Sequence, residues 1–134
     1  NASSEYIIRD HSRVKFEEKK RYLQAVTALL TGKYGEGVIK LTLKDQYYNM
    51  REMVEPYPEV IDKAFQAMEK AGVTPIVRPI RGGTDGARLS YMGLPCPNLF
   101  TGGMNFHGKY EYCSLNTMQK AMQTILNLIE LWGK

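Results

Sequence analysis

The chain is poor in the residues that build most metal and redox sites. Its 134 residues include two cysteines and two histidines, and neither an HExxH motif nor a CxxC pair occurs. A zinc site normally needs three or four protein ligands, so this chain cannot close one by itself. Cys96 and Cys113 stand in unrelated surroundings. This favours free thiols in a cytosolic protein, with a bridge between the two as the alternative.

Long apolar runs, nucleotide-binding motifs and basic clusters are lacking as well. No apolar run is long enough for a membrane span or a signal peptide, so no membrane association is expected. The absence of GxGxxG and GxxxxGK[ST] removes the nucleotide fingerprints. The net charge of +4 is spread along the chain, which argues against a nucleic-acid partner.

The periodicity of the apolar residues predicts helices alternating with short strands. Strands are expected at residues 5–10, at residues 37–46, where apolar and polar residues alternate, and at residues 74–80. A helix is expected from Ser12, as N-cap, to about Thr31, with Gly32 ending it. Its charged run, residues 17–21, is interpreted as a solvated face. The fold class that follows is mixed α/β.

Two further helices complete the pattern. One begins at Pro58 and is closed by Gly72. The last is capped by Ser114. Its apolar residues recur every three or four positions and should pack across a sheet; they are Met118, Met122, Ile125, Ile129 and Trp132.

Glycine and proline are concentrated between residues 79 and 112, and loops of that composition often carry function. Arg81 precedes Gly82 and Gly83, and Thr84-Asp85 has the character of a helix start. Backbone N–H groups beside a guanidinium suit an anion or a carboxylate, although an ordinary strand-to-helix turn is the alternative. His107 follows in a second glycine-rich loop. Three interpretations are open for it: a metal ligand, a general base or a surface residue.

The segment RGGTDGARLSYMGLPCPNLFTGGMNFHGKYE resembles the C-terminal part of the tripeptide aminopeptidases of the peptidase T family. These enzymes belong to the two-zinc exopeptidases related to aminoacylase. The upstream pieces YIIRDHSRVKFEEKK and YYNMREMVEPYPEVIDKAFQAMEKAG resemble the same family in the same order. The resemblance implies half of a strand–helix–strand lid in residues 1–48, followed by the C-terminal part of a catalytic domain in residues 49–134. Residues 1–4 are interpreted as a tag or junction.

By resemblance, the parent protein is a cytoplasmic, zinc-dependent hydrolase that releases the N-terminal residue of tripeptides. The family's His-x-Asp motif, bridging aspartate and Glu-Glu pair are not found in this chain, and Glu17-Glu18 does not match that pair. The interpretation is therefore a C-terminal fragment that is inactive alone and carries no catalytic residue. The alternative is a non-catalytic anion-binding or assembly module on the same fold.

The resemblance also assigns roles to single residues. His107 stands where the family places its last zinc ligand, and Arg81 and Arg9 match arginines that hold the C-terminal carboxylate of the tripeptide. Asn49 is a further substrate-binding candidate. The alternatives are an exposed strand-end charge for Arg9 and a linker position for Asn49. A half-lid would leave a strand edge at residues 37–46 unpaired, which predicts a homo-oligomer.

Overall fold

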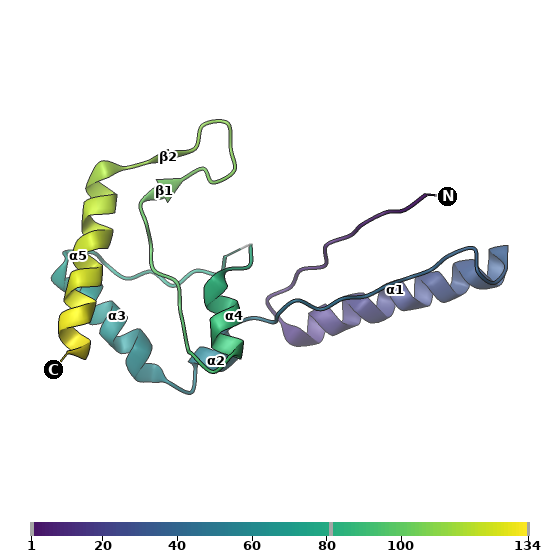
Figure 1. Cartoon of the computed structure of the whole chain (residues 1–134), viewed down its shortest axis with the longest axis horizontal. Coiled ribbons are helices and arrows are strands. Elements are labelled where there is room, and N and C mark those ends of the chain that lie inside the picture. Colours follow the sequence, from purple (N-terminus) through teal and green to yellow (C-terminus); the bar gives the residue numbers. More distant parts are fainter. Residues whose placement is uncertain (1, 81, 134) are drawn as a thin grey trace. The chain divides into compact units, whose positions relative to one another are not determined.

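The structure, a computed structural model, describes residues 2–80 and 82–133. The chain divides into two compact units, Asn1–Asn49 and Met50–Lys134. The first unit contains helix α1 (Arg13–Tyr34). The second contains α2 (Arg51–Val54), α3 (Pro58–Lys70), α4 (Asp85–Tyr91), β1 (Gly103–Met104), β2 (Tyr112–Cys113) and α5 (Leu115–Trp132) (Figure 1). This mixture of helices with a small antiparallel sheet confirms the mixed α/β class. In the described residues, no helix is long and apolar enough to cross a membrane.

Helix α1 begins where its N-cap predicts. The Ser12 side chain accepts the backbone N–H of Lys15 at 3.4 Å, and the helix continues to Tyr34. The prediction that Gly32 ends it is wrong. The helix ends at Gly35, which has a φ of 98° and donates its N–H to Thr31 O at 2.9 Å. A glycine inside a helix costs only about 1 kcal/mol relative to alanine, which α1 tolerates at Gly32.

The segments on either side of α1 are extended but form no strand. Residues 39–49 run back alongside α1 within the first unit (Figure 1). The strands predicted at residues 5–10 and 37–46 are wrong, because no backbone ladder joins either segment to a neighbour among the residues described. Side chains hold them instead: Lys19 Nζ donates to Arg9 O at 2.9 Å, and Asn49 Nδ2 donates to His11 O at 3.1 Å.

In the second unit, α3 and α5 pair antiparallel through small side chains. Ala67 and Thr124 are fully buried between the helices. Three polar contacts fix the register: Asn127 Nδ2 to Ala67 O at 3.0 Å, Lys120 Nζ to Ala71 O at 2.6 Å and Lys63 Nζ to Leu131 O at 3.0 Å. Each lysine therefore satisfies a carbonyl at the C-terminal end of the opposite helix, where an intrahelical partner is lacking.

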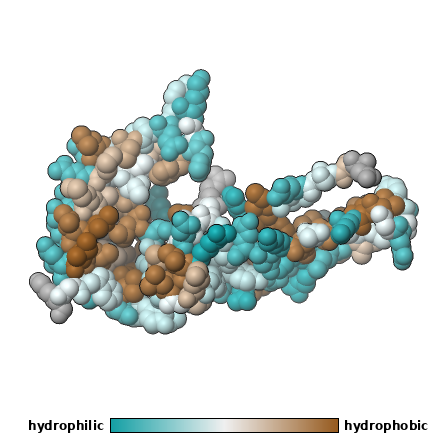
Figure 2. Space-filling model, viewed as in Figure 1, coloured by the Kyte–Doolittle hydropathy of each residue, from teal (hydrophilic) through white to brown (hydrophobic). Residues whose placement is uncertain are grey.

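The apolar stripe predicted for α5 forms, but it does not pack across a sheet. Its five residues, Met118, Met122, Ile125, Ile129 and Trp132, are 47% to 64% exposed. Figure 2 shows apolar side chains gathered on the surface where Figure 1 places α5. The packing prediction is wrong for the described residues because their only sheet pairs Gly103 with Cys113 and Met104 with Tyr112. Two-residue strands are too short to cover an eighteen-residue helix.

The strand predicted at residues 74–80 is also wrong. Pro75 and Pro79 lack the N–H that a strand ladder needs, and Ile76 and Val77 are exposed. The other element boundaries agree with the sequence. Pro58 opens α3, and Gly72, with a φ of 68°, follows its end.

Candidate functional site

A hairpin formed by β1 and β2 carries His107 in the loop between them. His107 has a φ of 62° and Asn105 a φ of 55°, so two residues other than glycine occupy the left-handed region. That conformation costs an L-residue roughly 1–2 kcal/mol and persists where the surroundings hold it. The His107 side chain is exposed, so its ring is accessible to a ligand.

Four hydrogen bonds hold this loop. Gly108 N donates to Asn105 O at 2.8 Å, and Asn105 Nδ2 donates to Tyr110 O at 3.3 Å. Glu111 N donates to Gly108 O at 3.2 Å, and Glu111 Oε2 accepts the backbone N–H of His107 at 3.0 Å. The sequence did not single out Glu111 as a site residue. The one local signal was its position four residues after His107.

Two glycines of the loop have close neighbours. A Cβ at Gly108 would lie 2.8 Å from Asn105 O, closer than carbon and oxygen approach without a bond. A Cβ at Gly103 would overlap the Phe106 ring, which lies over that glycine. The GMNFHG sequence is therefore explained by close packing within the loop.

The chemistry of His107 suits one zinc ligand, since an accessible imidazole nitrogen is a common donor to this metal. The described residues do not complete a site: no three of their His, Cys, Asp and Glu side chains come together in a way that could hold a metal ion. Among the described residues, His107 therefore fits the role of a single ligand and not of a complete metal site.

The turn before α4 is a helix cap, as its sequence predicts. Thr84 Oγ1 accepts Ala87 N at 3.4 Å and Asn98 Nδ2 at 3.2 Å. Fully buried Ser90 then ties the following segment to α4, because it donates to Gly86 O at 2.7 Å and accepts Cys96 N at 3.0 Å. The carboxylate-binding candidate of this turn, Arg81, lies outside the described residues.

The other two substrate-binding candidates belong to the first unit, whereas His107 belongs to the second. Arg9 and Asn49 both lie near the start of α1: the Arg9 carbonyl accepts Lys19 Nζ, and the Asn49 amide donates to the His11 carbonyl. The Asn49 contact spans 38 residues and links the end of the unit to the segment before α1.

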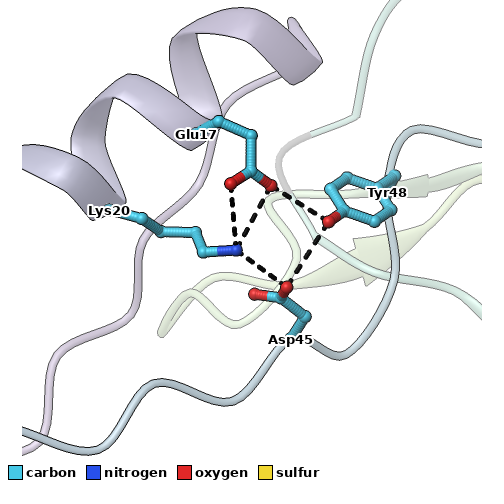
Figure 3. Close-up of polar contacts among 4 residues, drawn as sticks. All are labelled: Glu17, Lys20, Asp45 and Tyr48. Atoms are coloured by element: carbon cyan, nitrogen blue, oxygen red, sulfur yellow. Dashed lines mark hydrogen bonds and ion pairs between the residues drawn. The ribbon is translucent and has the colours of Figure 1, made fainter.

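A polar cluster links α1 to the extended segment that follows it (Figure 3). The ammonium of Lys20 lies 3.1 Å from Glu17 Oε2 and 2.8 Å from Asp45 Oδ2. The Tyr48 hydroxyl donates to Glu17 Oε1 at 3.0 Å and lies 3.4 Å from Asp45 Oδ2. Phe16 meets the Tyr48 ring edge-on, with 5.7 Å between ring centres.

The electrostatics of this cluster favour a structural role. The hydrogen bond from Lys20 lowers the pKa of Glu17, and the hydrogen bond to Asp45 raises the pKa of Lys20. The contact with Glu17 raises the pKa of Tyr48. An activated lysine or tyrosine needs a lowered pKa, so neither is prepared to act as a nucleophile or base at neutral pH. The expectation of a solvated charged face holds for the exposed Glu18, Lys19 and Arg21, but it is wrong for Lys20, whose side chain is only 15% exposed.

An open groove in the first unit is lined by Gln24, Thr27, Ala28, Leu41 and Leu43. None of these side chains ionises, so the groove offers no group for acid–base or metal chemistry.

Comparison with known proteins identifies the family that this chain resembles. The model of peptidase family M20/M25/M40 matches residues 6–131. The chain is 60% identical over 129 residues to a Peptidase T of Alkaliphilus oremlandii (strain OhILAs), which covers 96% of this chain and 32% of that protein. It is 58% identical over 130 residues to a Peptidase T of Clostridium novyi (strain NT), again 32% of the relative. The chain therefore spans about a third of the length of the curated relatives that it matches.

Proposed function

The chain belongs to peptidase family M20/M25/M40, and from this membership we propose that it is the C-terminal part of a zinc-dependent tripeptide aminopeptidase. The observation that carries the proposal is the 60% identity to a Peptidase T over 96% of the chain. At that level of identity, the loop that presents His107 is expected to serve the same purpose in both proteins.

His107 would be the residue of this chain that holds zinc. When bound, zinc polarises a peptide carbonyl and lowers the pKa of its water. The chain's other contribution is to substrate binding: the guanidinium groups of Arg9 and Arg81 would pair with the C-terminal carboxylate of the tripeptide, and the Asn49 amide would donate a hydrogen bond. Cytoplasmic location is part of the proposal.

The chain alone is expected to be inactive, because the described residues supply one fitting ligand where a catalytic zinc normally needs three. Its surface supports a place in a larger protein. Two separate compact units of these sizes would expose about 8,500 Å² in total, whereas this chain exposes 11013 Å². The additional length of the relatives would supply the missing ligands and cover the α5 stripe. Without that cover, the chain would self-associate.

A chimera tests the function. This chain would replace the matching third of the Alkaliphilus oremlandii Peptidase T, and release of the N-terminal residue from a tripeptide would be measured with zinc content. We expect activity that a chelator abolishes, and loss of both activity and zinc with His107→Ala.

The matched control is His11→Ala, which removes the chain's only other histidine, an exposed residue before α1. It should leave activity and zinc unchanged. A folded chimera without peptidase activity would refute the proposal and favour the non-catalytic module. An active chimera whose zinc content survives His107→Ala would remove His107 as a ligand.

A further inference from the structure

We propose that Glu111 is a positioning residue for His107: its carboxylate accepts the His107 backbone N–H and thereby sets the direction in which the imidazole is presented. The contact measures 3.0 Å from His107 N to Glu111 Oε2. The proposal rests on the proposed function in one respect, because it takes the His107 imidazole to be a metal ligand.

The direction of the imidazole depends on the backbone conformation of His107. Its φ is 62°, whereas an ordinary helical residue has a φ of about −63°. Relaxation to that value would turn the Cα–Cβ bond by roughly 120° about the N–Cα bond, relative to the preceding peptide. The side chain would then leave from a different side of the loop. An interaction that holds the N–H in place therefore also determines where the ring can reach.

Glu111 is well placed to hold that N–H. It immediately precedes Tyr112, which pairs with Met104 across the hairpin, and its own N–H donates to Gly108 O at 3.2 Å. The backbone of Glu111 is thus fixed by the hairpin, and its carboxylate reaches back to the loop. A hydrogen bond to a carboxylate is charge-assisted and stronger than one to a neutral acceptor.

Hydrogen exchange on this chain tests the positioning directly. Glu111→Ala should make the His107 amide exchange roughly tenfold faster, the lower end for a hydrogen bond to a charged group. It should also change the HN–Hα coupling of His107 as φ leaves the left-handed region. Glu111→Gln keeps an acceptor oxygen and should largely restore both measurements. Lys109→Ala, in the same loop, is the control and should leave them unchanged.

Two results would overturn the proposal at this level. One is wild-type exchange and coupling in Glu111→Ala, which would mean that the contact does not fix the loop. The other is a Lys109→Ala variant as disturbed as Glu111→Ala, which would mean that the loop responds to any side-chain loss and that the Glu111 carboxylate has no particular role.

Zinc affinity of the chimera, measured by competition with a chelator, tests the consequence. Glu111→Ala should weaken affinity about 10- to 100-fold, the range for groups that orient a ligand, and Glu111→Gln should weaken it less. Unchanged affinity in Glu111→Ala, with His107→Ala still losing zinc, would overturn the positioning role. If His107→Ala itself keeps zinc, the ligand assignment of the proposed function fails, and the exchange experiment alone decides what Glu111 does.

Discussion

Replacing the buried Asn127 by alanine should destabilise the second unit by about 2 kcal/mol. The Asn127 side chain lies between α3 and α5, is 7% exposed and donates to Ala67 O at 3.0 Å. A lost buried hydrogen bond costs about 1–3 kcal/mol. The middle of that range applies because Ala67 O keeps the N–H of Ala71, at 3.2 Å, as a second partner. In a unit of this size, 2 kcal/mol corresponds to a fall in Tm of about 8–16 °C.

Circular dichroism at increasing temperature would measure this change. Gln119→Ala is the matched control, because Gln119 is an exposed amide on the same helix. Its effect should stay within about 0.5 kcal/mol. Asn127→Asp, which puts an acceptor against Ala67 O, should cost at least as much as alanine. Equal small losses in Asn127→Ala and the control would refute the proposed packing of α3 on α5.

Three further predictions concern other parts of the molecule. The pKa of Glu17 is lowered, so its carboxylate should stabilise the fold at pH values above the ordinary carboxyl pKa. That stabilisation should be lost as the pH falls through the lowered pKa. Urea unfolding at several pH values should therefore show a free energy of unfolding that depends less on pH in Glu17→Gln than in the unaltered chain. Gly108→Ala should disturb the hairpin loop, because its Cβ would lie 2.8 Å from the backbone oxygen of Asn105; loss of cross-strand contacts between Met104 and Tyr112 in NMR spectra would verify it. The isolated chain should be at least dimeric at micromolar concentration, and light scattering that finds only a 15.3 kDa species would contradict this.

Helix starts could be predicted because each depends on a bond within one turn. Ser12, Thr84 and Ser114 each accept the backbone N–H three residues later. Strands could not be predicted in the same way. The alternation at residues 37–46 reports which side chains can share a face, but a strand forms only where another backbone pairs with it, and the described residues bring none there.

The candidate site, like the fold, could be predicted only in part. His107 could be singled out because its surroundings resemble a known family, while its left-handed backbone has no signature in the residue itself. The contact between Glu17 and Tyr48 joins positions 31 residues apart, and no local sequence pattern indicates it. The resemblance to the peptidase T family was confirmed by the comparisons, whereas the roles of Arg9, Arg81 and Asn49 stay predictions.

The contact between Lys63 and Trp132 provides a natural optical probe. Trp132 is the only tryptophan of the chain, and the Lys63 ammonium lies 3.8 Å from the centre of its ring. Excitation selective for tryptophan therefore reports on the end of the α3–α5 pair and is silent for the first unit. A cation over an indole face alters the electrostatic environment of the ring, so separation of the two helices should change the emission. Emission and ellipticity followed together would reveal whether the two units unfold in one transition or in two, without any label being added.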